Sequence, residues 1–179
     1  MSLLKFLRLN LEESAQSPNQ TETVRKITKA LDSLDPERAK FIAAFAYLLG
    51  RAARADLNIS PEETQAMEKI VMEKGALPEE QAVIVIQIAK TQNILFGGTE
   101  NYLVSREFKD ITGYPERMAL VDCLYAVAAA DKSISTVEDN EISQIADELR
   151  VEHRDFIAIR QKYRDFLAVF KDSPKLNAD

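Results

Sequence analysis

One short acidic stretch occurs twice in this sequence, with equivalent positions 75 residues apart. Residues 53–63 read ARADLNISPEE, and residues 128–138 read AAADKSISTVE. Both copies contain small residues, an Asp, a short turn, an Ile-Ser pair and a Glu seven positions after the Asp. Each copy lies between two segments whose apolar residues repeat with helical periodicity. The sequence therefore predicts an all-α fold with two pseudo-symmetric halves, each a helix–corner–helix unit.

The spacing of apolar residues predicts a single helical bundle of about seven helices. Only five Gly and six Pro interrupt the 179 residues, so most of the chain can be helical. We expect the helices at about residues 22–33, 36–55, 61–74, 79–91, 115–130, 136–149 and 153–170. The segment 79–91 is apolar on nearly all sides, which predicts that it is buried at the centre. Asp35, Ser60 and Ser135 are expected N-caps, and Gly75 is expected to end a helix.

These helices divide the chain into an N-terminal arm, one domain and a flexible tail. In that order the three parts are residues 1–21, 22–171 and 172–179. Within the domain, repeat one covers about 36–91 and repeat two about 115–170. The periodicity weakens between residues 93 and 114, where residues 100–109 predict no more than a helical turn or two. We interpret this segment as a link between the repeats, and a lid over a ligand is the alternative.

Composition and charge exclude several classes of partner and site. The formal net charge of −6 and the absence of a basic stripe argue against nucleic acid as a ligand. Cys123 is the only cysteine and His153 the only histidine, so an internal disulfide and a multi-histidine metal site are both excluded. The apolar run at residues 1–9 contains a Lys and an Arg and is too short to span a membrane. We expect a cytoplasmic protein with no direct membrane insertion.

The candidate functional residues are the four carboxylates of the two corners. Asp56 and Asp131 continue the apolar faces of the helices that precede them. Glu63 and Glu138 begin the apolar faces of the helices that follow. Carboxylates are rarely placed on such faces unless they are paired, hydrogen-bonded or bound to a metal. The pattern therefore predicts a divalent-cation site made by these four residues.

Other interpretations of the same four residues stay open. The two Glu side chains stand at the third position of a capping box, and the two Asp side chains can cap amides of the turn, so all four could be structural. They could also form part of a surface for a protein partner. An EF-hand is excluded, because Pro61 and Met67 stand where its loop needs a Gly and a bidentate Glu. Oxygen ligands alone leave Ca²⁺, Mg²⁺, Mn²⁺ and Zn²⁺ as candidates.

The doubled pattern A-D-x-x-I-S-x-x-E, at residues 55–63 and 130–138, resembles the TerB-like family. That family includes tellurite resistance proteins and the N-terminal domain of a membrane-anchored co-chaperone. The resemblance covers roughly residues 37–165. It implies an all-helical fold, a divalent-cation site at Asp56, Glu63, Asp131 and Glu138, and a role in tellurite resistance or a stress response. Members of the family commonly have Gly directly after the Asp, whereas this chain has Leu57 and Lys132.

No motif for catalysis accompanies the acidic corners. The sequence contains no Gly-rich phosphate loop, no nucleophile elbow and no Cys/His pair. Cys123 is expected to be a small core residue, His153 a surface or capping residue, and Asp122 a residue on the exposed side of its helix. We therefore expect a non-enzymatic, metal-responsive adaptor with a protein partner. The alternative is a helical protein–protein interaction module whose acidic corners are only helix caps.

Overall fold

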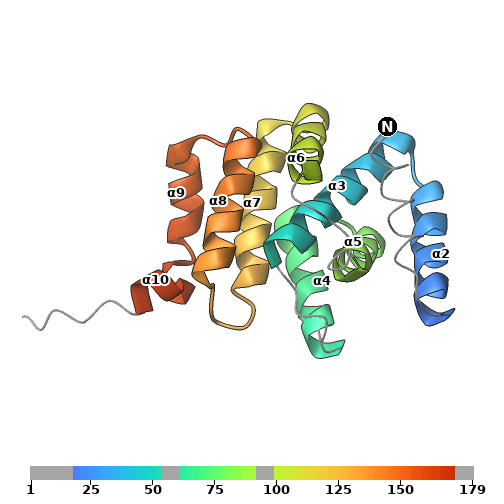
Figure 1. Cartoon of the computed structure of the whole chain (residues 1–179), viewed down its shortest axis with the longest axis horizontal. Coiled ribbons are helices and arrows are strands. Elements are labelled where there is room, and N and C mark those ends of the chain that lie inside the picture. The colour runs from blue at the N-terminus through green and yellow to red at the C-terminus, as the bar shows by residue number, and fades with distance from the viewer. Residues whose placement is uncertain (1–17, 54–60, 92–98, 172–179) are drawn as a thin grey trace, which may run out of the picture.

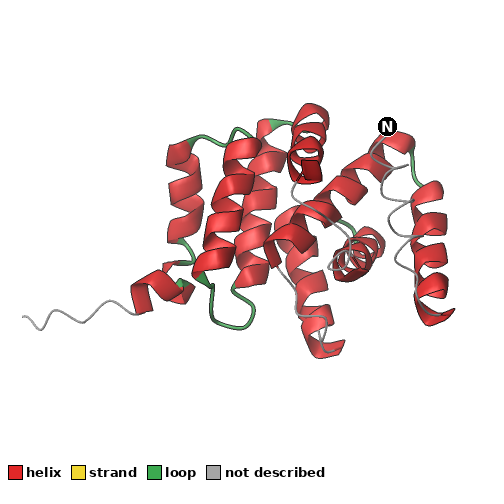
Figure 2. Ribbon diagram, in the orientation of Figure 1, coloured by secondary structure: helices red, strands yellow, loops and turns green. Residues whose placement is uncertain are grey.

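The computed structural model describes residues 18–53, 61–91 and 99–171, and these ranges are almost entirely helical (Figure 2). In chain order the elements are α2 (Pro18–Asp32), α3 (Pro36–Ala53), α4 (Pro61–Gly75), α5 (Glu79–Thr91), α6 (Thr99–Ile111), α7 (Tyr114–Ala128), α8 (Thr136–Glu148), α9 (His153–Gln161), the 3-10 helix η2 (Arg164–Phe166) and α10 (Ala168–Lys171). Within these ranges the extended pairing is a single isolated bridge between Ile134 and Leu167. The predicted all-α class is confirmed.

Helix α3 lies at the centre of the molecule (Figure 1). It packs against α5, α6, α7 and α8, and α2 covers α3 and α5 at one end of the structure. Residues 42–50 are all buried, so this stretch of α3 has no solvent face. The prediction that 79–91 would be the central helix is wrong. That helix, α5, leaves Gln87 exposed and Val83 and Ile84 partly buried, because its run of apolar residues covers one side of α3 rather than filling the centre.

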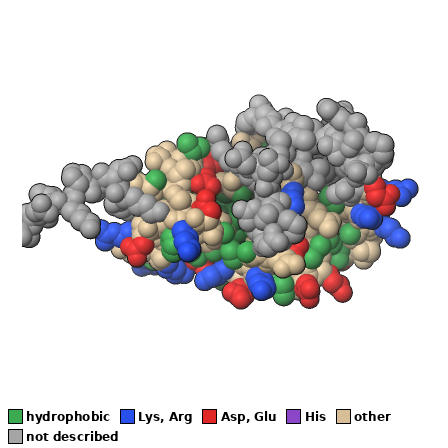
Figure 3. Space-filling model, turned by 90° about the horizontal axis from the view of Figure 1, so that it is seen from below, with side chains coloured by type: hydrophobic (Ala, Val, Ile, Leu, Met, Phe, Trp, Pro, Cys, Tyr) green, Lys and Arg blue, Asp and Glu red, His purple; other side chains and the backbone are tan. Residues whose placement is uncertain are grey.

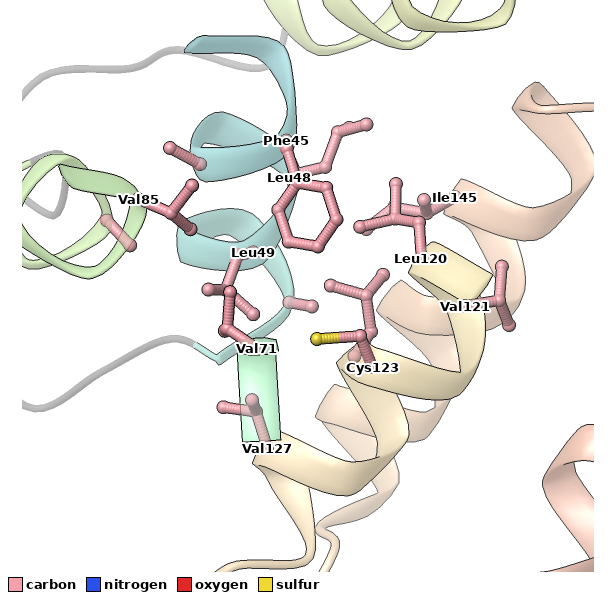
Figure 4. Packing of buried hydrophobic residues seen from close by; sticks show 14 of the residues in the cluster. Phe45, Leu48, Leu49, Val71, Val85, Leu120, Val121, Cys123, Val127 and Ile145 are labelled. Atoms are coloured by element: carbon pink, nitrogen blue, oxygen red, sulfur yellow. The ribbon is translucent and has the colours of Figure 1, made fainter. Parts of the chain in front are cut away.

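The two halves share one hydrophobic core. Figure 4 shows Phe45 and Leu49 of α3 facing Leu120 and Cys123 of α7, with Val71 of α4 between them. All five side chains are at most 1% exposed. Since such side chains stabilise the fold by roughly 1.5–3 kcal/mol each when buried, the contact between α3, α4 and α7 holds the two halves together.

The predicted helix starts agree with the structure where it describes them. The Oδ1 atom of Asp35 accepts hydrogen bonds from the amides of Glu37 (3.0 Å) and Arg38 (3.4 Å), as an N-cap does. The end of α4 differs from the expectation. Gly75 is the last helical residue, and Ala76 takes the left-handed conformation (φ 53°). A Cβ at Gly75 would lie 2.8 Å from Cζ of Phe45, so close packing explains this glycine.

Three helices depart from their predicted bounds. The first begins at Pro18 instead of near residue 22, and residues 1–17 of the expected arm lie outside the described ranges. The expected link contains α6, a helix of 13 residues that packs against α3 and α8 with Val104 and Phe108 buried. Its short apolar stripe gave too weak a periodicity for a full helix to be predicted. The last predicted helix stops at Gln161, after which the chain continues through η2 and α10.

Candidate functional site at the acidic corners

The structure describes one of the two acidic corners in full. Asp56 lies in residues 54–60, outside the described ranges, and so does the expected N-cap Ser60. Glu63 lies in the first turn of α4, and the placement of its side chain is not described. The second corner, residues 129–135, connects α7 to α8 and is described completely. The helix starts are consistent with the repeat, since α4 begins at Pro61 and α8 begins 75 residues later at Thr136.

Asp131 and Glu138 are bonded within their own corner. Oδ1 of Asp131 accepts a hydrogen bond from the amide of Ser133 at 2.9 Å, which forms an Asx turn. Oε2 of Glu138 accepts from the amide and the hydroxyl of Ser135, both at 2.8 Å, and Oγ of Ser135 accepts from the Glu138 amide at 3.2 Å. The predicted capping box at Ser135 is therefore confirmed.

These contacts do not bring the two carboxylates together as a ligand set. Asp131 is exposed and Glu138 is partly exposed. Among the described residues there is no group of three or more His, Cys, Asp or Glu side chains arranged to hold a metal ion. The capping bonds use one oxygen of each carboxylate, Oδ1 of Asp131 and Oε2 of Glu138. The geometry of this corner is that of a helix cap, and a cation there would need water as its other ligands.

The backbone conformation at Lys132 explains why Gly is common after the Asp of this motif. Its φ is 67°, the left-handed region in which a residue with a Cβ costs roughly 1–2 kcal/mol. Glycine avoids this cost but loses roughly 0.5–1 kcal/mol of chain entropy on folding. We predict that Lys132→Gly raises the free energy of unfolding by about 0.5 kcal/mol, whereas Lys132→Ala does not, as measured by urea denaturation. A Lys132→Gly variant less stable than Lys132→Ala would contradict this account of the turn.

The prediction that Asp122 lies on the exposed side of its helix is wrong. Its side chain is 15% exposed and its Oδ1 accepts a hydrogen bond from the Tyr163 hydroxyl at 3.0 Å. Lys74 of α4 and Lys162 form ion pairs with the same carboxylate, at 3.4 Å and 3.2 Å. The neighbouring Cys123 is fully buried as predicted, and burial raises the pKa of its thiol to about 12. His153 is exposed at the start of α9, also as predicted.

A buried polar cluster beside the second corner was not predicted. Asp139 of α8 is 8% exposed. Its carboxylate accepts hydrogen bonds from Nε (2.8 Å) and Nη2 (2.6 Å) of Arg160 on α9. The hydroxyl of Tyr125 on α7 donates to Oδ1 of Asp139 at 2.8 Å. Burial alone would raise the pKa of Asp139, but the hydrogen bonds from Arg160 and Tyr125 outweigh it, so the pKa lies below its usual value. This cluster joins three helices around one charge pair.

A second unpredicted cluster joins the two halves of the molecule. Arg51 of α3, 6% exposed, bonds to Glu141 and to both carboxylate oxygens of Glu148 on α8, the latter at 2.6 and 3.1 Å. The hydroxyl of Ser105 on α6 donates to Glu148. Burial pushes the pKa of Glu148 up, yet the bonds from Arg51 and Ser105 leave it below its usual value. One guanidinium thus pairs with two carboxylates between the repeats.

Both clusters had a signal in the sequence. Asp139 precedes the buried Ile142 and Ala146 by three and seven positions, so it shares their helix face. Arg51 is the first charged residue after the ten apolar or small residues 41–50. A charged side chain in such a position requires a partner. The partners could not be identified, because they lie on other helices.

The comparisons with known proteins agree with this helical architecture. The family model for the tellurite resistance protein TerB matches residues 41–161, about two thirds of the chain. The chain belongs to the TerB family. No curated protein matches the sequence. No solved structure matches it either.

The described residues of this TerB-family protein contain no candidate for a membrane span. None of the described helices is both long enough and apolar enough to cross a bilayer. On the coloured part of the face in Figure 3, acidic and basic side chains lie intermixed rather than in a patch of one sign. This surface offers no continuous positive stripe of the kind that tracks a phosphate backbone.

Proposed function

We propose that this TerB-family protein is a non-catalytic cytoplasmic adaptor that contributes to tellurite resistance or a stress response by binding a protein partner. The observation that supports it best is the state of the described ionisable groups in the core. Asp139, Glu148 and Asp122 are each paired with a cation and a hydroxyl, and the Cys123 thiol is buried with a raised pKa. Groups held in this way stabilise the helices and do not act as acids, bases or nucleophiles.

The second corner favours the cap interpretation of its acids within this proposal. Asp131 and Glu138 are bonded to amides of their own turn, which is sufficient reason for both side chains. Substituting a cap by Ala costs about 1 kcal/mol in typical helices. A protein surface built on capped helices suits an adaptor, because the helices themselves are ordered before the partner binds.

A divalent cation is the second candidate ligand. Two observations support it. The corner sequence occurs twice, and the capping bonds use only one of the two oxygens of Asp131 and of Glu138. The proposed ligands are Asp56, Glu63, Asp131 and Glu138, completed by water, with Ca²⁺, Mg²⁺, Mn²⁺ or Zn²⁺ as the ion. A cation that binds the folded protein alone raises its melting temperature in a saturable way.

Metal titration separates the two candidates. If the cation site exists, adding each ion to the metal-free protein raises the Tm to a plateau, and Asp56→Ala combined with Asp131→Ala abolishes the rise. At 100 times the Kd the stabilisation is about 2.7 kcal/mol, or roughly 5–11 °C for a chain of this size. Asp147→Ala is the matched control, since Asp147 is an exposed acid on α8. If none of the four ions raises the Tm in a saturable way, the cation site is excluded and only the adaptor proposal remains.

The role in tellurite resistance is tested in cells that carry the gene. Deleting the gene should raise sensitivity to tellurite, and the wild-type gene should restore growth. Restoration by the quadruple variant Asp56→Ala, Glu63→Ala, Asp131→Ala, Glu138→Ala would mean that the corners bind no functional cation. Failure of the wild-type gene to change tellurite tolerance would refute the resistance role.

A further inference from the structure

The second acidic corner is covered by the C-terminal strap, which we define as residues 163–169. The amide of Ile134 donates to the carbonyl of Phe166 at 2.8 Å, and the amide of Ala168 donates to the carbonyl of Ile134 at 2.9 Å. These two bonds form the isolated parallel bridge between Ile134 and Leu167. Ile134 is fully buried and Leu167 is 1% exposed. Leu167, the extended residue between η2 and α10, therefore pairs with the corner as one residue of a strand pairs with a strand edge.

The strap is the corner's link to the rest of the chain through backbone hydrogen bonds. Within the described ranges, the other backbone bonds of residues 129–135 are local: Ala129 to Tyr125, Ala130 to Val127, Lys132 to Ala129 and Asp139 to Ser135. The long-range pair goes to the strap. If the strap leaves, Ile134 loses both backbone partners. The exposed edge then offers one donor and one acceptor beside an apolar side chain.

The strap begins at a packed aromatic side chain and ends in a short, partly exposed helix. Tyr163 stacks on Tyr125 at 5.6 Å between ring centroids and donates to Asp122 at 3.0 Å. After it the helix α9 has ended, and α10 is only four residues long, with Val169 48% exposed. In Figure 1, α10 lies at the end of the molecule where the chain turns from α7 to α8. Such an arrangement allows residues 164–169 to open without unfolding the helices.

We propose that the second corner is a docking site for a short peptide with one extended, Leu-like residue, filled in the resting protein by its own C-terminal strap. The partner segment needs a Leu-like side chain at the position of Leu167, and a carbonyl and an amide on either side of it. This defines the chemistry of the partner in the adaptor proposal above and rests on that proposal for its biological meaning. Displacement of the strap would link partner binding to the conformation around Asp131 and Glu138.

A labelled peptide tests the site on the full-length chain. The probe is a fluorescein-labelled nine-residue peptide, YRDFLAVFK, with the sequence of residues 163–171. In the Leu167→Asp variant the strap is dislodged, and we expect saturable binding in fluorescence anisotropy. The control Val169→Asp changes an exposed position of the same strap, so the strap stays docked and binding is at least about tenfold weaker. A peptide with Asp at the Leu position should not bind either variant.

A folded Leu167→Asp variant that binds no peptide overturns the proposal. If that variant does not fold, amide hydrogen exchange of the wild-type protein decides. A strap that opens locally lets the Ile134 amide exchange at least about tenfold faster than the amide of Leu124 in α7. Equal protection of the two amides means that the strap leaves only on global unfolding, and the proposal is then wrong. Peptide binding without a tellurite phenotype would keep the docking site and remove only its proposed role in resistance.

Discussion

Replacing Asp139 by Ala is expected to lower the free energy of unfolding by about 3 kcal/mol, which is roughly 6–12 °C in Tm for a chain of this size. The variant leaves the guanidinium of Arg160, 23% exposed, and the hydroxyl of Tyr125 without their shared acceptor. The cost comes mainly from the desolvated donors of Arg160 and Tyr125 that lose this acceptor rather than from the net value of the pair. The measurement is thermal and urea denaturation followed by circular dichroism.

The control for this prediction is Asp147→Ala on the same helix. Asp147 is exposed, so its removal should change the free energy of unfolding by no more than about 0.5 kcal/mol. A double-mutant cycle with Arg160→Met isolates the pair, because the double variant has neither charge. If Asp139→Ala and Asp147→Ala are equally stable, the cluster around Asp139 contributes nothing to the fold.

The same cluster predicts a dependence of stability on pH. The folded-state pKa of Asp139 is below its unfolded value, so its contribution is fully present above the unfolded pKa of about 3.9. That contribution is lost as the pH falls through the lower, folded pKa. We expect the wild-type Tm to fall steeply below about pH 4 and the Tm of Asp139→Asn to fall less over the same range. Parallel curves for the two proteins would exclude Asp139 as a source of acid sensitivity.

The helices could be predicted from the sequence because each carries its own signals. Asp35 and Ser135 start helices with side-chain caps, and the period of the apolar residues reports a buried face without reference to the rest of the chain. The weak period over α6 hid a helix whose buried side chains, Val104 and Phe108, depend on α3 for their environment. The end of α9 was missed because residues 164–168 leave the helix to pair with Ile134, which is a tertiary contact.

The site was harder to predict than the fold, since its partners come from different helices. The repeat placed Asp131 and Glu138 at a corner but could not decide between capping and cation binding. It also carried no information on the Asp139 cluster, because 75 residues earlier Tyr125 corresponds to Gly50, Asp139 to Thr64 and Arg160 to Val85. The two halves share the corner sequence and differ in the polar contacts beside it.

Arg51→Met is expected to have the largest effect of the single substitutions, about 4 kcal/mol or roughly 8–16 °C in Tm. It removes a cation that bonds to both Glu141 and Glu148, whose side chains are 17% and 12% exposed. Lysine should not restore stability, because a single ammonium cannot match the fork of bonds that the guanidinium makes. Thermal denaturation of Arg51→Met and Arg51→Lys at neutral pH tests both statements.

The pH dependence identifies the cause of that loss. In the wild-type protein the pKa of Glu148 is lowered, so the contribution of the carboxylate is present above its unfolded pKa of about 4.3 and declines below it. Without Arg51 the buried carboxylates favour the protonated form, so the deficit of Arg51→Met should shrink as the pH falls toward 5. Adding Glu141→Gln and Glu148→Gln should recover at least about half of the lost stability at pH 7, since no buried charge then remains in this cluster. Arg106→Met, at an exposed position of α6, is the control.

A stability deficit of Arg51→Met that stays constant with pH and is not relieved by the two Gln substitutions would contradict this account. It would mean that Arg51 acts through the packing of its aliphatic chain.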